Sequence, residues 1–210
     1  MKWPDQGGEV KLKFLLLNAE NLFVLMDQPP TSDVMKLEET QWQKLSSSVY
    51  ENKPLKKLIE LKKLIEEQKP DLVMLCEVGG IESLNNFNER FLDHQYSAAL
   101  LEGNSDRNID VGYLISKKCQ FYFDLQSNKN RSIQFQYDPK GPQLKFARDV
   151  AELRLFTQDI NNPFLVILLT HLKSHLDPEK VDPQGQGRRT AELKTLVDIS
   201  LEIKAQHPKT

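Results

Sequence analysis

The sequence has little of what marks several common classes of protein. Its two cysteines, Cys76 and Cys119, are too few for a disulfide framework, and we expect both to be reduced residues of the core. The formal net charge is only −2, which weakens the case for a protein that binds nucleic acid by charge alone. The apolar run at residues 14–25 is interrupted by polar residues and is too short to span a bilayer.

The first residues also lack the apolar region of a signal peptide. With no expected membrane span, these absences predict a soluble, cytoplasmic protein, unless an upstream segment has been removed. The length of 210 residues suits one sizeable domain, and we expect residues 1–210 to form a single domain.

Strands and helices alternate in the first half of the chain. Residues 54–68 predict an amphipathic helix whose apolar positions form one stripe, and this helix lies between the expected strands 13–17 and 71–76. A strand, a helix and a strand in this order are typical of a parallel crossover. A second helix, 81–92, leads into another expected strand, 96–101. Residues 27–53 are polar and contain Pro29 and Pro30, which favours a surface loop with a short helix in its middle.

The second half of the chain predicts strand after strand, followed by a helix over residues 187–206. The expected strands are 111–116, 119–125, 131–138, 150–157 and 164–170. The link at 158–163 is short and rich in turn residues, so the last two strands should form a hairpin. Crossovers followed by hairpins predict a mixed sheet covered by helices, in the α/β or α+β class.

The most informative feature is Glu77, a carboxylate at the end of the apolar run in KPDLVMLCEVGG. Burial of a carboxylate is costly unless it is paired or binds a metal. Ligands of open α/β sheets lie just beyond the carboxyl ends of the strands. Glu77 is therefore the residue at which a metal is most expected.

Other polar residues also end or begin apolar strands. Asn18 follows the first strand, and Arg148 and Asp149 precede the strand at 150–157. His171, Lys173 and His175 follow the strand at 164–170. Each has an ordinary explanation, as a cap, a surface ion pair or a structural histidine. Together with Glu77 they supply a hard oxygen ligand, an amide, a cation and an imidazole, which suit attack on a phosphoester assisted by Mg²⁺ or Mn²⁺ rather than Zn²⁺.

Five segments in this order resemble the endonuclease/exonuclease/phosphatase family. They are FLLLNAENLF, KPDLVMLCEVGG, RNIDVGYLIS, FARDVAELRL and LVILLTHLKSH, and the helix start GRRTAEL follows them. The resemblance extends over residues 12–194 and implies a DNase I-like fold, a two-sheet α/β sandwich flanked by helices. It also implies divalent-metal-dependent hydrolysis of a phosphoester by a water nucleophile.

The resemblance also implies roles for particular residues. Glu77 matches the metal-binding glutamate, and Asn18 matches an asparagine near the metal and the scissile phosphate. Arg148 resembles an arginine that contacts the phosphate, and His171 resembles a histidine that contacts the phosphate or assists the leaving oxygen.

Four more residues are expected to bind substrate. Arg107, Asn108 and Asp110 belong to the RNIDVG motif, which resembles one bacterial branch of the family. Arg107 is expected to meet a phosphate and Asp110 to orient its neighbours, while Lys173 adds positive charge at the same edge.

Two motifs of the family pattern are not found in this sequence. These are a strand ending in Gly-Asp-x-Asn and a late Ser-Asp-His, which position the nucleophile and supply a general-base His–Asp pair. Short matches at 106–108, 159–161 and 93–94 are rejected because they fall in a loop, in a turn and after a helix. We therefore expect a C-terminally incomplete catalytic domain, inactive alone and prone to self-associate through an uncovered sheet edge.

Three hypotheses remain open. The chain is part of a phosphoester hydrolase that is active in a full-length form, a degenerate member that acts as a binding module, or an unrelated α/β domain with coincidental polar residues. The substrate is also open among nucleic acid, a phospholipid headgroup, an inositol phosphate and a nucleotide. The near-neutral charge disfavours a processive binder of duplexes, and the RNIDVG resemblance favours a bacterial nuclease or phosphodiesterase.

Overall fold

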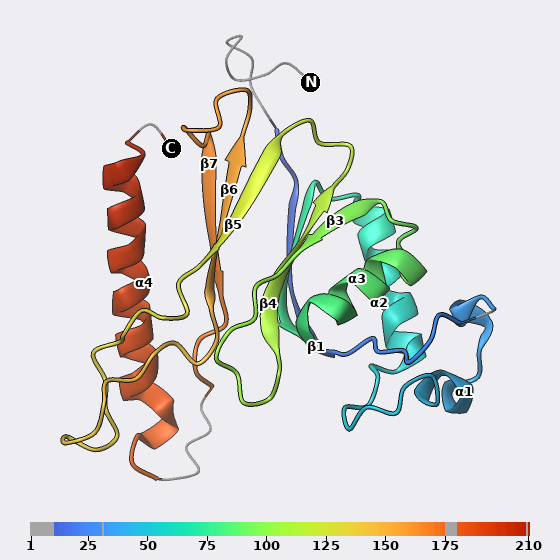
Figure 1. Cartoon of the computed structure of the whole chain (residues 1–210), viewed down its shortest axis with the longest axis horizontal. Helices are drawn as coiled ribbons and strands as arrows, with labels where there is room; N and C mark the ends of the chain where they lie inside the picture. Colours follow the sequence, from blue (N-terminus) through green and yellow to red (C-terminus); the bar gives the residue numbers. More distant parts are fainter. Residues whose placement is uncertain (1–10, 31, 175–179, 209) are drawn as a thin grey trace.

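Two β-sheets pack face to face, and helices cover both outer faces (Figure 1). The computed structural model describes residues 11–30, 32–174, 180–208 and 210. Helices α2 (Leu55–Gln68) and α3 (Gly80–Phe91) cover the first sheet, and α4 (Gln186–Gln206) covers the second. The predicted two-sheet sandwich flanked by helices is confirmed.

The first sheet is mixed and contains the predicted crossover. Its strands are β1 (Phe14–Leu22), β2 (Leu72–Val78), β4 (Asp110–Ser116) and β3 (Tyr96–Ala99), in this spatial order. β1 and β2 are parallel and are joined through α2, whereas β4 is antiparallel to both of its neighbours. Because β1 and β2 run in parallel, their carboxyl ends lie at the same edge of the sheet.

The second sheet is antiparallel and consists of β5 (Tyr122–Ser127), β6 (Val150–Phe156) and β7 (Leu165–Thr170). The predicted hairpin is β6–β7. Its register pairs Val150 with Thr170, so the residues just before β6 lie beside those just after β7. This register brings Arg148 and His171 into the same neighbourhood.

Residues 131–138 do not form the predicted strand. The segment folds back on residues 144–145 through backbone hydrogen bonds of Ile133 and Phe135 with Leu144 and an isolated bridge between Ser132 and Lys145. Its apolar residues Ile133 and Phe135 pack against α4. The apolar residues of this alternating pattern are therefore buried beside α4, and the segment does not become a strand of either sheet.

Three apolar clusters hold the layers together. One joins the first sheet to α2 and α3, a second fills the space between the sheets, and a third joins the second sheet to α4. Tyr113 of β4 links the sheets through polar contacts as well, since its hydroxyl lies 2.9 Å from the carbonyl oxygen of Ala151 and 3.2 Å from that of Ile167. Interlocked layers of this kind fix the strand ends relative to one another.

The segment 27–53 is more than the predicted surface loop. It contains the expected short helix, α1 (Glu39–Gln43), and 3₁₀ turns lie at Val34–Lys36 and, elsewhere in the chain, at Pro183–Gly185. Trp42 is completely buried, and its indole nitrogen donates to the carbonyl oxygen of Lys53 at 2.9 Å. This anchor holds the end of the segment against the first sheet.

Within the described part of the chain, no helix combines the length and the apolar composition needed to cross a bilayer.

Candidate functional site

The carboxyl ends of β1 and β2 carry irregularities that redirect their side chains. The pairing of the two strands shifts between Asn18 and Leu22, and the pairing of β2 with β4 shifts between Cys76 and Val78. Glu77 has a φ of 62°, in the left-handed region that residues other than glycine seldom adopt. Such bulges often re-aim a side chain next to a functional site, and backbone strain is stored at such sites.

Glu77 is the centre of the candidate site. Its side chain is 16% exposed, and its Oε1 accepts a hydrogen bond from Asn18 Nδ2 at 3.3 Å. Asn18 lies opposite Cys76 in the β1–β2 pairing, which explains the contact. His171 approaches from the second sheet, with Nδ1 at 3.8 Å from Glu77 Oε1. The two sheets therefore both contribute to one polar cluster.

His171 is mostly buried, and this governs its charge. Burial lowers the pKa of the imidazole below its ordinary value of 6.5, and the nearby Arg148 guanidinium lowers it further, while Glu77 raises it. The buried Nδ1 makes no hydrogen bond to the described residues. A lowered pKa makes the neutral imidazole the main form at pH 7, so His171 can exchange a proton or accept a hydrogen bond.

Arg148 is a cation held at the same end of the second sheet. It is 9% exposed, and its Nη1 donates to the carbonyl oxygen of His171 at 3.4 Å. Its Nε is buried and has no hydrogen-bond partner among the described residues. Burial lowers the pKa of Arg148, while the charge of Glu77 raises it. A guanidinium held in place beside Glu77 and His171 is a cation suited to binding an anion, although its buried Nε is not the atom that an incoming anion would meet.

The residues of the RNIDVG motif lie in different places. Arg107 joins the cluster: its Nη2 donates to Asn21 Oδ1 at 3.0 Å, and its charge lowers the pKa of His171. Asn108 donates from Nδ2 to the Tyr50 hydroxyl at 2.6 Å.

Asp110 is buried, and its Oδ1 accepts from the backbone N–H of Gly103 at 2.8 Å. Burial raises the pKa of its carboxyl group. Asn108 and Asp110 thus use their side chains in contacts within the protein, and the substrate-binding roles expected for them stay predictions.

Lys173 follows His171, and its backbone N–H donates to Glu192 Oε2 at 2.7 Å. His175, which was grouped with these residues, lies outside the described residues.

The structure adds Lys53 to the site, which the sequence did not reveal. Lys53 is 9% exposed, and its Nζ donates to the carbonyl oxygen of Glu20 at 3.1 Å. Burial lowers the pKa of its amine, while the carboxylates of Glu20 and Glu77 raise it. Nothing in the polar segment 27–53 distinguished this lysine from its neighbours, because contacts with distant residues place it: its carbonyl oxygen accepts from the buried Trp42, and its backbone N–H donates to the carbonyl oxygen of Phe23 at 2.8 Å.

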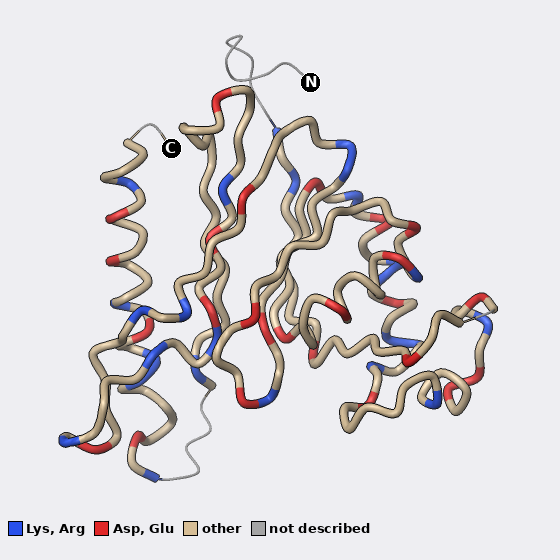
Figure 2. Tube along the Cα trace, in the orientation of Figure 1, with Lys and Arg blue, Asp and Glu red and all other residues tan. Residues whose placement is uncertain are grey.

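A groove of about 580 Å³ lies beside this site. Glu20, Asn21, Phe23, Tyr50, Lys53 and Arg107 are among the residues that line it. Phe23 and Tyr50 stack with their ring centroids 4.7 Å apart. Figure 2 shows lysine and arginine intermixed with aspartate and glutamate along the described chain.

Among the described residues, no three His, Cys, Asp or Glu side chains gather in a way that could hold a metal ion. Glu77 supplies carboxylate oxygens, which suit a hard cation. Asn18 turns its Nδ2 to Glu77, and its Oδ1 accepts from the backbone N–H of Glu20 at 2.9 Å, so its oxygen would reach a cation only after the amide rotates. Mg²⁺ is commonly bound through one or two carboxylates with water and substrate phosphates as its other ligands. The residues present therefore fit a partial Mg²⁺ site.

Comparisons with known proteins agree with this architecture. No protein-family model and no curated protein matches the chain. A crystal structure of truncated TDP2 from Caenorhabditis elegans matches with a TM-score of 0.52 and 17% identity, covering 94% of this chain and 57% of that one. Two further structures of TDP2 from C. elegans give TM-scores of 0.47 and 21% identity, covering 72% of this chain and 38% of theirs.

The chain therefore spans little more than half the length of the first of these proteins. At this level of identity the similarity concerns the fold. The chain has the DNase I-like fold, a mixed α/β sandwich of two sheets with flanking helices.

Proposed function

We propose that the protein contributes the metal-binding and phosphate-binding half of a divalent-metal-dependent phosphoester hydrolase that uses water as its nucleophile. The observation that supports this most is the convergence of Asn18, Glu77, Arg148 and His171 from both sheets, through contacts of 3.3, 3.8 and 3.4 Å. A carboxylate, an amide, a buried cation and a neutral imidazole are the groups that hydrolysis of a phosphoester requires.

Each group has a role in this proposal. Glu77 and Asn18 would hold Mg²⁺ or Mn²⁺, which supplies charge stabilisation at the phosphoryl oxygen and a more acidic water. Arg148 binds a phosphate oxygen through its guanidinium group, with Arg107 and Lys173 adding positive charge at the rim. His171 remains neutral at pH 7 and contacts the phosphate or the leaving oxygen. Asn108 and Asp110 would support the substrate site without contacting substrate. Asn108 holds the Tyr50 side chain, and Asp110 holds the backbone of residue 103.

The substrate is a phosphoester, and nucleic acid is one candidate. The second candidate function is a binding module that retains the fold without hydrolysis. It is favoured by the sequence, which contains neither Gly-Asp-x-Asn nor Ser-Asp-His. A polypeptide that carries this chain together with the two motifs distinguishes the two functions: a hydrolase would cleave a phosphoester, whereas a binding module would bind it without cleavage.

The decisive test is hydrolysis by such a complete polypeptide. We expect Mg²⁺-dependent cleavage of at least one phosphoester in a panel of DNA, RNA, phospholipid, inositol phosphate and nucleotide substrates. The Glu77→Ala variant should lose that activity because the cation loses its carboxylate ligand. Unchanged activity in Glu77→Ala would contradict the metal site, and binding without cleavage would favour the binding module.

We also propose that this chain self-associates through the open edge of the second sheet. Among the described residues, β7 pairs only with β6, which leaves the backbone groups on its other side without a strand partner. Such an edge is a template for pairing with another chain. Sedimentation velocity over a range of concentrations should show dimers or larger species, and a monomer at every concentration would contradict the proposal.

A further inference from the structure

Glu192 is a charged residue in an unusual position, because it is 1% exposed in the second turn of α4. A buried carboxylate is costly unless its oxygens are hydrogen-bonded. The expected roles of the polar strand ends do not account for it, since it lies on a helix behind the site. Its contacts indicate what it does.

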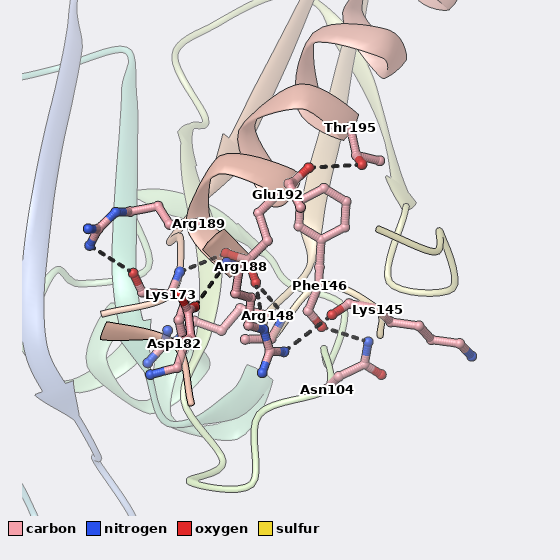
Figure 3. A network of polar contacts seen from close by, with 12 residues as sticks. Asn104, Lys145, Phe146, Arg148, Lys173, Asp182, Arg188, Arg189, Glu192 and Thr195 are labelled. Carbon is pink, nitrogen blue, oxygen red and sulfur yellow. Dashed lines mark hydrogen bonds and ion pairs between the residues drawn. The ribbon is translucent and has the colours of Figure 1, made fainter. Parts of the chain in front are cut away.

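The two carboxylate oxygens bind the backbone on either side of the site (Figure 3). Oε1 accepts from the backbone N–H of Ala147 at 3.2 Å, and Oε2 accepts from that of Lys173 at 2.7 Å. Ala147 precedes Arg148, and Lys173 lies two residues after His171. One side chain thus joins the segment that enters β6 to the segment that leaves β7.

Neighbouring arginines of α4 hold the same two segments. Arg188 lies one turn before Glu192, with its Nε 3.4 Å from Oε1, and its Nη2 donates to the carbonyl oxygen of Lys145 at 3.3 Å. Arg189 donates from Nη1 to the carbonyl oxygen of Lys173 at 3.4 Å. The start of α4 therefore binds both segments through their backbone atoms (Figure 3).

The contact between Arg148 and His171 cannot set their spacing alone. It is a single hydrogen bond of 3.4 Å from a side chain to a backbone oxygen. A hydrogen bond at this length is weak. The short bond from Lys173 and the bond from Ala147, both to one buried carboxylate, constrain the two segments more tightly.

We propose that Glu192 is a positioning residue, which fixes the spacing of Arg148 and His171 by holding the backbone N–H groups of Ala147 and Lys173. The inference rests on the proposed function, because it is the phosphate contact that this spacing serves. It assigns no contact between Glu192 and substrate. This role accounts for a buried carboxylate at position 192, where an apolar side chain would otherwise be expected to pack.

The test measures phosphate affinity and local structure in this chain with inorganic phosphate as the probe. In Glu192→Gln, the amide oxygen can accept from only one of the two N–H groups. The dissociation constant for phosphate should rise about 2- to 30-fold, the range for a substitution that disturbs a binding site without touching its ligand. Backbone amide NMR signals of Ala147 and Lys173 should move. The matched control is Glu202→Gln on the same helix, whose carboxylate pairs with Arg131 and is exposed; it should leave both measurements unchanged.

Three outcomes separate the possibilities. If Arg148→Met leaves the phosphate affinity unchanged, the proposed phosphate site is wrong. If Arg148→Met weakens binding but Glu192→Gln lowers only the melting temperature, Glu192 is merely structural and the inference is overturned. If Glu192→Gln does not fold, Glu192→Asp replaces it, because aspartate keeps the charge but is too short to reach both N–H groups. Wild-type phosphate affinity in Glu192→Asp would overturn the positioning role of Glu192.

Discussion

Replacement of Glu77 by glycine is expected to abolish divalent-cation binding and to change the stability of the fold in two opposite ways. The side chain that would bind the cation is lost. The folded state is stabilised by relief of backbone strain, because Glu77 has a φ of 62° and a left-handed conformation costs a residue with a Cβ about 1–2 kcal/mol. The same change removes the carboxylate that lies near the buried cations of Lys53 and Arg148, which offsets part or all of this gain. The melting temperature should therefore lie below that of a control variant that has the backbone gain alone.

Lys69 supplies the matched control for this experiment. It ends α2 with a φ of 47°, so Lys69→Gly should have the backbone gain alone and raise the melting temperature by roughly 2–4 °C. It lies at the other end of β2 and should leave cation binding unchanged. Binding is followed through the broadening by Mn²⁺ of NMR signals from Asn18 and His171. Broadening in Glu77→Gly equal to that in the wild type would exclude Glu77 as a ligand.

The second large effect is expected from Arg148→Met. In a complete polypeptide the rate of hydrolysis should fall about 10²–10³-fold, the usual loss when one donor to the developing charge is removed. The dissociation constant of this chain for inorganic phosphate should rise at least about tenfold on the same grounds. The fold should tolerate the change, because the buried guanidinium leaves Nε without a hydrogen bond and methionine fills a similar volume.

Arg154→Met gives the opposite pattern and serves as the control. Arg154 pairs with Glu152, which is 4% exposed, so its loss leaves a buried carboxylate without its ion-pair partner. Such a loss costs about 3–5 kcal/mol. Thermal unfolding should therefore show a lower melting temperature for Arg154→Met with phosphate affinity unchanged. A large fall in stability without loss of affinity in Arg148→Met would show that this arginine is structural.

Much of the fold follows from local patterns along the chain. The stripe of α2 and the apolar runs of β2, β4, β6 and β7 were predicted close to their observed bounds, because the periods of helix and strand differ. Residues 131–138 show the limit of this approach. Their alternation suits a strand, but the neighbouring surface is a helix, and no local pattern encodes which surface a segment will meet.

The candidate site was predictable where it depends on strand ends. Glu77 could be identified because it lies next to the last residue of β2. The prediction that Asn18 ends the first strand was wrong, since β1 continues to Leu22, but the parallel pairing places Asn18 opposite Cys76 and its side chain contacts Glu77. The contacts of Asn108 and Asp110 could not be predicted from the sequence, because their partners, Tyr50 and Gly103, are brought near by loops. Lys53 and Glu192 gave no signal, because a lysine in a polar segment and a glutamate on a helix are ordinary until they are buried.

The sequence by itself determined the class of fold, the position of Glu77 at a strand end and the kinds of groups available for phosphoester chemistry. These depend on period, residue type and strand direction, all of which are local properties. Only the tertiary structure decided that His171 reaches Glu77 from the other sheet, that Arg148 is buried with an unused donor and that Glu192 holds both segments. Those facts depend on how the layers pack, and packing is set by contacts between residues far apart in the chain.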